Sequence, residues 1–249
     1  MSQDSGEAPK NVIASPPKRT GIWFTSFIVI AVGVLLVALL LPTVRTARPA
    51  AYRAQCANNL KQIALALLQY EQTYNSLPPA YTVDADGKRL HSWRTLVLPF
   101  IEGKSVYQKI DLSKAWDDPA NSEAYNTSVW SFRCPRDNCP QNHTTYLASV
   151  SPNGCFRPTG PRPLSEVSDA LSQTLMVIEV PDDRSVHWMS PLDADETLIM
   201  AWGSNSKLAH NGGVNAAFCD GSVHFLKDNL SPAARRALIS GSGNYESAR

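Results

Sequence analysis

Three side chains near the C-terminal end of the sequence have the types that a hydrolytic triad uses: His210, Asp220 and Ser222. A general base must lie within hydrogen-bond reach of its partner. Ten residues of mostly extended chain, at about 3.3 Å each, would instead place His210 up to roughly 30 Å from Asp220. We therefore expect separate structural roles, with Asp220 in a turn and His210 holding the glycine loop that follows it, and we expect the protein not to be an enzyme.

Glu179 and a Cys/His group are the other candidates for chemistry. Glu179 closes an apolar strand pattern, and a carboxylate in that position is more often a buried hydrogen-bond acceptor than a catalyst. Cys134, Cys139 and His143 could be read as metal ligands, but they lack the second ligand pair that a structural zinc site uses. The sequence therefore predicts no metal and no cofactor.

The chain has five cysteines, an odd number. If the folded part lies outside the cytoplasm, up to two disulfides can form and one thiol is left over. The pairing cannot be deduced from the sequence, and a cysteine can also serve as a small buried apolar residue. All five are therefore disulfide candidates: Cys56, Cys134, Cys139, Cys155 and Cys219.

A β-hairpin is the clearest local element. Asp220-Gly221 is typical of a two-residue type I′ turn, which would make Cys219 face Ser222. Side chains alternate between the two faces of a strand, so this pairing predicts one apolar face. That face would carry Val214, Ala216, Phe218, Val223 and Phe225. The other face would be wet or line a contact, and it would carry Asn215, Cys219, Ser222 and His224.

An apolar segment precedes all of these elements. Residues 22–41 contain no charged side chain, and a helix of that length spans roughly 30 Å, the thickness of the hydrocarbon layer of a membrane. The segment is longer than the apolar core of a cleaved signal peptide, the alternative interpretation. It therefore predicts a transmembrane helix. Charge does not decide its orientation, because three basic residues lie on each side: Lys10, Lys18 and Arg19 before it, and Arg45, Arg48 and Arg53 after it.

The rest of the chain is expected to follow from this anchor. Leu60, Ile63 and Leu67 recur at helical spacing, which predicts an amphipathic continuation of the helix. Eighteen prolines and thirteen glycines indicate a loop-rich body. The expected organisation is a disordered cytoplasmic tail or leader at 1–21, a transmembrane helix at 22–41, its amphipathic continuation at 42–76, an extracytoplasmic body at 77–240 and a flexible tail at 241–249.

The expected fold class is α+β, with the long N-terminal helix packed on a small antiparallel sheet, loop-rich insertions and a C-terminal β-hairpin. Helical or capping patterns occur over residues 92–110, from Asp118-Pro119, over 193–200 and over 231–239, and strand patterns over 144–150 and 175–180. The net charge of +1 without a basic stripe argues against nucleic acid as a partner.

The hairpin and the loop before it resemble the signature of a known bacterial family. His210-Asn211-Gly212-Gly213, followed by Asp220-Gly221, is similar to the H-x9-DG motif of a family described as prepilin-type processing-associated. The resemblance covers roughly residues 40–230, and its motif positions here are His210, Gly212, Asn215, Asp220 and Gly221. Segments that also fit the family are 56–63, 92–94, 98–100, 132–135, 175–179 and 187–193.

The resemblance implies a pilin-like body of unknown function on a membrane anchor. Members usually begin with a prepilin leader that is cleaved after a glycine, here Gly21, and have a glutamate where this chain has Ser26. That carboxylate is thought to pair with a neighbouring subunit in a filament, so we do not expect this chain to enter one. The implied partners are the membrane and other pseudopilin-like or secretion-system proteins, with the N-terminus in the cytoplasm and the body on the periplasmic side.

Two functions follow from these patterns. The first is a structural or interaction role, for example in secretion or surface assembly. The alternative is a module that binds an extracytoplasmic ligand, because one label of the family groups it with solute-binding proteins. Trp188, Trp202, His187 and His224 could line such a site, although buried tryptophans and hydrogen-bonded histidines are the simpler interpretation.

Overall fold

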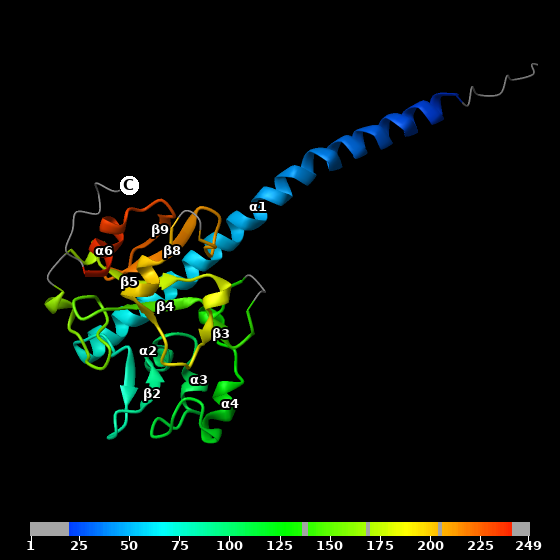
Figure 1. Ribbon diagram of the computed structural model, residues 1–249. Coiled ribbons are helices and arrows are strands. Elements are labelled where there is room, and N and C mark those ends of the chain that lie inside the picture. The colour runs from blue at the N-terminus through cyan, green and yellow to red at the C-terminus, as the bar shows by residue number, and fades with distance from the viewer. Residues whose placement is uncertain (1–19, 136–138, 168–169, 204–205, 241–249) are drawn as a thin grey trace, which may run out of the picture. The chain divides into compact units, whose positions relative to one another are not determined.

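The computed structural model describes residues 20–135, 139–167, 170–203 and 206–240, with the side chains of 20–22 and 40–47 left out. Of the two predicted tails, residues 1–19 and 241–249 lie outside the described residues. The chain divides into two compact units, Met1–Arg48 and Pro49–Arg249 (Figure 1). One helix, α1 (Thr20–Tyr74), has residues in both units.

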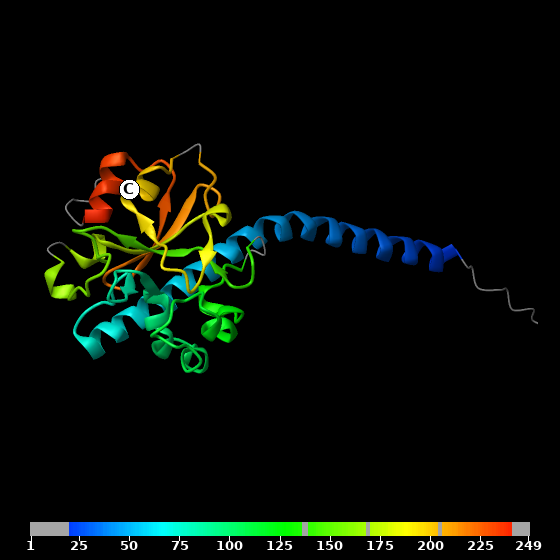
Figure 2. The same cartoon turned by 60° about the horizontal axis from the view of Figure 1, so that its bottom comes forward.

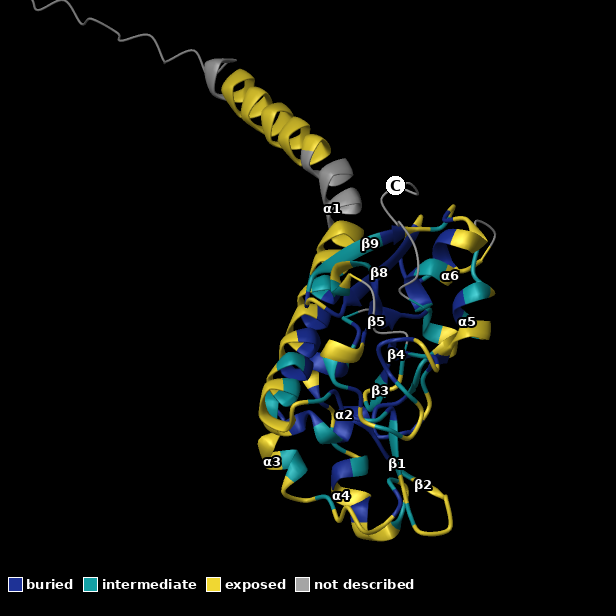
Figure 3. Cartoon of the chain, turned by 90° about the vertical axis from the view of Figure 1, so that its left-hand side faces the viewer, coloured by how far each residue is buried: buried dark blue, intermediate teal, exposed yellow. Residues whose placement is uncertain are grey.

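The first unit contains the beginning of α1, including Gly21, the predicted cleavage position. Every residue described from 23 to 39 is exposed, and most are apolar (Figure 3). Trp23, for example, keeps 78% of its surface open. Across the described residues, no helix combines the length and the hydropathy of a membrane span. The structure thus gives residues 22–41 the predicted helical conformation but does not show a transmembrane helix.

In the second unit, α1 presents an apolar stripe. Cys56, Leu60, Ile63 and Leu67 follow one another at spacings of three and four residues, and all are fully buried. The helix ends at Tyr74, and the next residue, Asn75, has a φ of 57°, the left-handed conformation that commonly terminates helices. This is the amphipathic helix that the spacing of the apolar residues predicts.

A five-stranded sheet forms the centre of the second unit. Its order is β7-β4-β5-β8-β9, and neighbours are antiparallel except for β4 and β7, which are parallel. The strands are β4 (Tyr146–Val150), β5 (Leu175–Glu179), β7 (Ala194–Asp195), β8 (Gly213–Phe218) and β9 (Val223–Lys227). Two short pairs lie outside it: β1 (Tyr81–Val83) with β2 (Arg89–Ser92), and β3 (His143–Thr144) with β6 (Val186–His187).

Short helices occupy the connections. After α1 these are α2 (Trp93–Leu96), α3 (Lys104–Tyr107), α4 (Ser122–Tyr125), α5 (Glu196–Met200) and α6 (Pro232–Ser240). Turns of 3-10 helix are η1 (Leu98–Phe100), η2 (Pro119–Asn121), η3 (Trp130–Phe132), η4 (Leu164–Glu166), η5 (Leu171–Gln173) and η6 (Asp182–Arg184). The predicted cap at Asp118 is confirmed, since its carboxylate accepts a hydrogen bond from Ala120 N at 2.9 Å.

Helices cover both faces of the sheet. The C-terminal part of α1 lies on one face, and α5 and α6 lie on the other (Figures 2 and 3). On the α1 side the core includes Leu60, Ile63, Leu67, Met176, Val177 and Ala217; on the other side it includes Leu175, Ile178, Phe218, Ile199, Leu238 and Ile239. The central strands β5 and β8 are therefore buried along their whole length, as expected for strands without a solvent face.

The β8–β9 hairpin differs from the predicted hairpin by one residue. Phe218 N–H donates to Ser222 C=O, and Gly221 N–H donates to Phe218 C=O, which leaves a three-residue loop. Of the loop residues Cys219, Asp220 and Gly221, only Gly221 has a positive φ, 81°. A type I′ turn needs two such residues. The predicted two-residue turn is therefore wrong.

The shift changes which side chains share a face. Asn215 pairs with Phe225 and Ala217 with Val223, so Val223 and Phe225 lie on the face of Asn215. Of the two alternatives for the other face, wet or lining a contact, the second holds for Asn215 and Cys219, which are buried on the α1 side of the sheet. A polar side chain in that position needs an internal hydrogen-bond partner.

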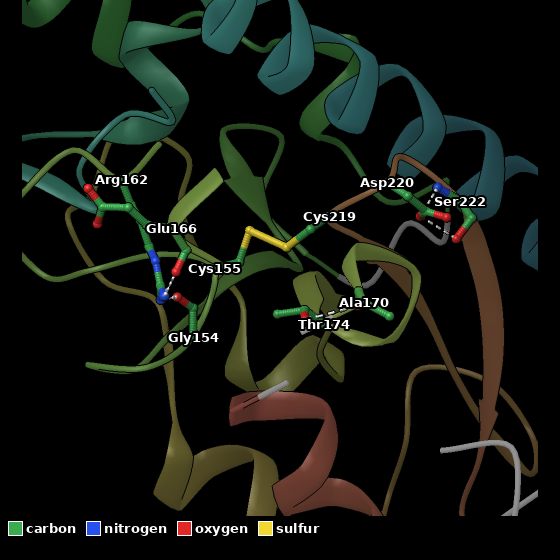
Figure 4. Close-up of a disulfide and its surroundings, with 9 residues drawn as sticks. All are labelled: Gly154, Cys155, Arg162, Glu166, Ala170, Thr174, Cys219, Asp220 and Ser222. Atoms are coloured by element: carbon green, nitrogen blue, oxygen red, sulfur yellow. Dashed lines mark hydrogen bonds between the residues drawn. A yellow bond between two sulfur atoms is a disulfide. The ribbon is translucent and has the colours of Figure 1, made fainter. Parts of the chain in front are cut away.

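One disulfide occurs among the described residues, between Cys155 and Cys219, whose Cα atoms are 6.7 Å apart (Figure 4). It joins the loop after β4 to the tip of the β8–β9 hairpin. Cys56, Cys134 and Cys139 remain thiols in the structure. The disulfide therefore selects one pairing among those that the sequence left open.

Candidate functional site

Glu179 is a carboxylate buried between α1 and the sheet. It ends β5 and is 1% exposed. His210 Nε2 donates a hydrogen bond to its Oε2 at 2.9 Å, and Asn215 Nδ2 donates to the same oxygen at 3.0 Å. The sequence-based expectation of a buried hydrogen-bonded carboxylate is confirmed, but its two partners were not predicted.

The Cys56 thiol of α1 approaches the same carboxylate, and a second thiol from the loop after η3 lies beside it. Cys56 Sγ lies 3.9 Å from Cys134 Sγ, and both side chains are buried. The Cys56 sulfur, a Glu179 oxygen and a His210 ring nitrogen all lie within 4.8 Å of one another. The fully buried Tyr146 pairs with Glu179 across the ladder between β4 and β5. We refer to six residues as the Glu179 cluster: Cys56, Cys134, Tyr146, Glu179, His210 and Asn215.

A tight turn brings His210 to this cluster. The backbones of His210 and Gly213 exchange hydrogen bonds at 3.1 and 3.3 Å, and Gly212 between them has a φ of 77°. A positive φ is favourable for glycine and costly for other residues. The backbone of His210 thus closes the glycine loop, the role expected for this residue, while its imidazole has a second role as the partner of Glu179.

Burial and nearby acidic groups disfavour ionisation inside the Glu179 cluster. The interaction with the Cys134 side chain, burial and the Glu179 carboxylate raise the pKa of the Cys56 thiol far above its usual range. Burial, followed by the charges of Glu179 and Cys56, raises the pKa of the Tyr146 phenol well above 10. Without a cation, both groups therefore remain protonated.

Asp220 and Gly221 lie at the other end of β8. Asp220 Oδ1 accepts hydrogen bonds from the backbone N and the hydroxyl of Ser222, at 2.8 and 2.6 Å. Gly221 O accepts a hydrogen bond from Lys61 Nζ of α1 at 2.7 Å. The structure therefore does not bring His210 to Asp220 and Ser222, and the H-x9-DG pattern joins two turns, one at each end of β8.

A second buried polar group surrounds Arg94, the residue after Trp93 at the start of α2. Its guanidinium donates to Asp193 Oδ1 at 2.7 Å and to four backbone carbonyls, those of Tyr146, Trp188, Ser190 and Leu192. Asp193 Oδ1 also accepts from Trp93 Nε1 and Ala148 N. We call Trp93, Arg94 and Asp193 the Arg94 cluster.

The residues considered for a ligand site separate in the structure. Trp188 and His187 are buried, with Trp188 Nε1 donating to Thr127 O and His187 Nε2 donating to Tyr125 O. His224 packs edge-on against Phe218 at 5.3 Å. Trp202 alone among them lines a pocket. The simpler interpretation is therefore confirmed for Trp188 and His187.

Cys139 and His143, which were considered as metal ligands from the sequence, have other partners in the structure. Cys139 Sγ lies 3.8 Å from Asp182 O, and His143 Nδ1 is hydrogen-bonded to Ser185 Oγ. Among the described residues, the group of side chains with metal-ligand geometry is Cys56, Glu179 and His210. These residues come from three distant parts of the sequence, so spacing alone could not reveal them. The available signals were the carboxylate that ends an apolar strand and the segments that resemble the family.

Together, these observations define an α+β protein in which the C-terminal part of an N-terminal helix covers one face of an antiparallel sheet over buried polar clusters. A family model described as "Protein of unknown function (DUF1559)", with the label SBP_bac_10, matches residues 45–207, about two thirds of the chain. The chain belongs to this family. No curated protein and no solved structure matches it. The matched region ends before His210, so it does not test the H-x9-DG motif.

Proposed function

We propose that the protein is a single-pass membrane protein whose second unit has a structural or interaction role outside the cytoplasm. The exposed apolar surface of α1 from residue 23 to 39 is the observation that carries this proposal. Transfer of apolar surface out of water contributes about 25 cal/mol per Å². A helix that exposes Trp23, Phe24, Phe27 and its other apolar side chains is stabilised by lipid around it.

The disulfide supports the location of the second unit. Disulfides persist in oxidising compartments and are rare where glutathione and thioredoxin keep thiols reduced. A bond between Cys155 and Cys219 is therefore typical of a body on the extracytoplasmic side. With this orientation, residues 1–21 are on the cytoplasmic side of the membrane.

The interior of the body supports a non-catalytic role. The Arg94 and Glu179 clusters are both buried, and their hydrogen bonds connect elements distant in the sequence. Such networks fix one arrangement of the chain. The resemblance to pseudopilin-like proteins then favours a component or accessory of secretion or surface assembly, while Ser26 argues against a filament subunit.

Charge insertion into α1 tests the membrane anchor. In the double variant Val32→Lys/Leu35→Lys, two cations lie in the apolar segment, and insertion of each costs about 2.5–3.5 kcal/mol at the centre of a membrane helix. We expect the wild-type protein in the membrane pellet after an alkaline wash and the variant in the soluble fraction or degraded. Leu65→Lys, at an exposed position of α1 in the second unit, is the matched control and should stay in the pellet. Soluble wild-type protein would contradict the anchor.

Two further measurements test the topology and the processing. A membrane-impermeant protease added to cells with a permeabilised outer envelope should digest the second unit, and protection until the inner membrane is lysed would contradict the extracytoplasmic location. The intact mass of the purified protein then shows its N-terminus. A chain that begins at Ile22 would indicate prepilin-type cleavage after Gly21, and the complete N-terminus would indicate a plain signal anchor.

One pocket favours ligand binding as a second candidate function. It has a volume of about 270 Å³ and lies between the end of β5 and α5. Its lining includes Leu198, Leu208, Arg184, Lys207 and Trp202, whose buried Nε1 forms no hydrogen bond. Glu179 and Asp183 balance the two cations in the lining, so the indole N–H beside apolar side chains suits a small neutral organic ligand with a hydrogen-bond acceptor. Benzamide and hexanol should raise the melting temperature more than toluene and hexane; equal effects of the polar compounds and the hydrocarbons would contradict this site.

A further inference from the structure

We propose that the Glu179 cluster is a structural zinc site, in which Cys56, Glu179 and His210 bind the ion and the neighbouring Cys134 moves in as the fourth ligand. The inference goes beyond the proposed membrane function and does not depend on it. It concerns residues that α1, β5, the turn before β8 and the loop after η3 bring together at the buried side of the sheet.

The distances between the donor atoms fit one ion. One ligand atom each of Cys56, Glu179 and His210 lies within 4.8 Å of the others. Two thiolates bound at about 2.3 Å to a tetrahedral zinc ion are about 3.8 Å apart. The observed separation of Cys56 Sγ and Cys134 Sγ is 3.9 Å, but Cys134 lies outside the group of three, so its side chain must shift toward Glu179 and His210 to complete the site. The imidazole nitrogen and the carboxylate oxygen, 2.9 Å apart, need to separate by only a few tenths of an ångström to bind the same ion.

The carboxylate of the cluster also has room for one more partner. Glu179 is 1% exposed, and its Oε1 is buried without a hydrogen bond. Among the ion pairs of the described residues, its partner is His210, which is charged only when protonated. The other deeply buried carboxylate, Asp193, has the permanent cation Arg94 beside it. At the Glu179 cluster a zinc ion would be bound directly by the buried carboxylate, and its two positive charges would replace the two protons that the thiols release, so the net charge of the cluster would not change.

The donor types select the metal. Two thiolates, one imidazole and one carboxylate are the ligand types of tetrahedral Zn²⁺ sites, whereas Mg²⁺ and Ca²⁺ prefer sites made of oxygen. Neighbouring groups hold the ligands in place: Asn215 Nδ2 donates to Glu179, and Asn59 Nδ2 donates to the backbone carbonyl of Arg133, next to Cys134. All four ligands are buried, so the site has the closed form of a structural ion rather than the open position of a catalytic one.

A disulfide between Cys56 and Cys134 is the competing state. It would join α1 to the loop after η3 and would remove both sulfur ligands. Zinc binding deprotonates both thiols and ties them to the ion, so it also protects them from oxidation. The two states differ in mass, in metal content and in their response to chelators, and one preparation can distinguish them.

The test uses the full-length chain, purified in detergent without chelators. Elemental analysis should find about one zinc per chain, and mass spectrometry after alkylation under denaturing conditions should find Cys56 and Cys134 reduced beside the intact Cys155–Cys219 disulfide. His210→Ala and Cys56→Ser should lower the zinc content at least tenfold. Cys139→Ser, a half-buried cysteine outside the cluster, is the matched control and should keep the metal.

Cobalt substitution tests the site in the wild-type protein, so it does not depend on whether the variants fold. The wild-type protein loaded with Co²⁺ should show an intense sulfur-to-cobalt charge-transfer absorption and the d–d bands of a tetrahedral site, and EDTA should lower the melting temperature of the zinc form by several degrees. Three results would overturn the proposal: a Cys56–Cys134 disulfide in the native protein, wild-type protein with reduced thiols and less than a tenth of a zinc per chain, or full zinc content in folded His210→Ala.

Discussion

The Arg94 cluster and the Glu179 cluster each bury a carboxylate beside the same sheet, but they stabilise it in different ways. Asp193 lies 2.7 Å from a guanidinium that is always charged, and the remaining donors of Arg94 bind backbone carbonyls. Glu179 has an imidazole, an amide and the Cys56 thiol around it. Each carboxylate has one oxygen without a hydrogen bond, Asp193 Oδ2 and Glu179 Oε1. Because the guanidinium of Arg94 is always charged, the Arg94 cluster is a complete ion pair. The partner of Glu179 is an imidazole, so the Glu179 cluster is a site that can take up a metal ion.

The largest expected effect comes from breaking the Arg94 cluster. Arg94→Ala leaves Asp193 buried without its cation, and the loss of one partner of a buried pair costs about 3–5 kcal/mol. Urea unfolding of the second unit should show this decrease, with or without EDTA. Arg94→Lys keeps the charge but not the planar fork, so it should recover only part of the loss. A decrease below about 1 kcal/mol for Arg94→Ala would contradict the central role of the ion pair.

A smaller effect is expected from the contact between α1 and the tip of the β8–β9 hairpin, at the end of β8 away from the Glu179 cluster. Gly221 has a φ of 81°, and a Cβ there would lie 2.8 Å from Leu68 Cδ1 of α1. Gly221→Val should therefore destabilise the protein by about 2 kcal/mol, because a β-branched residue resists positive φ and the added atoms meet the helix. Gly160→Val is the control, since a Cβ at Gly160 meets no atom within 4 Å. Equal melting temperatures of the two variants would contradict the observed turn.

The pH dependence of stability should report on His187, which precedes Trp188 near the Arg94 cluster. Burial lowers the pKa of its imidazole to about 4, against an ordinary value of 6.5. Between these values the unfolded chain binds a proton that the folded protein does not, so stability should fall as the pH decreases from 6.5 to 4. We expect a contribution on the order of 1 kcal/mol. Unfolding at several pH values should show a flatter profile for His187→Gln but not for His224→Gln; identical profiles would contradict the assignment.

The smallest effect is expected from a direct comparison of the two carboxylates in metal-free protein. In Glu179→Gln the amide oxygen can still accept from His210 and Asn215, and a buried charge is removed, so stability should change by less than about 1 kcal/mol. Asp193→Asn, by contrast, leaves Arg94 buried without its anion and should cost several times more. Equal losses in urea unfolding would show that the clusters do not differ in the proposed way.

The sequence predicts the elements of this fold better than their pairing. Periodicity identified the buried stripe of α1, and the Asp118-Pro119 pattern identified a helix start, because both signals are local. The hairpin register could not be read from Asp220-Gly221, since the same dipeptide fits both a two-residue and a three-residue loop. A shift of one residue then moves every side chain of β9 to the other face.

The candidate site was less predictable for a different reason. Glu179 could be expected to be buried, because a strand pattern ends there, but its partners His210 and Cys56 lie 31 residues downstream and far upstream on α1. Such contacts depend on the order of the strands in the sheet. The parallel pairing of β7 with β4 likewise has no local signal. Spacing rules therefore found the Cys134, Cys139 and His143 group and missed the one that the fold assembles.

The disulfide has a consequence for the resistance of the protein to proteolysis. It closes a loop over a sequence separation of 64 residues, and Glu179, Asp193 and His210 all belong to this loop. A protease cut at the exposed Thr159 would divide the polypeptide into two pieces that Cys155 and Cys219 still join covalently. The anchored piece would retain Arg94 and Cys56, and the tethered piece would retain their acidic and imidazole partners. A nicked molecule can therefore remain assembled, and only reduction together with cleavage would release the C-terminal piece.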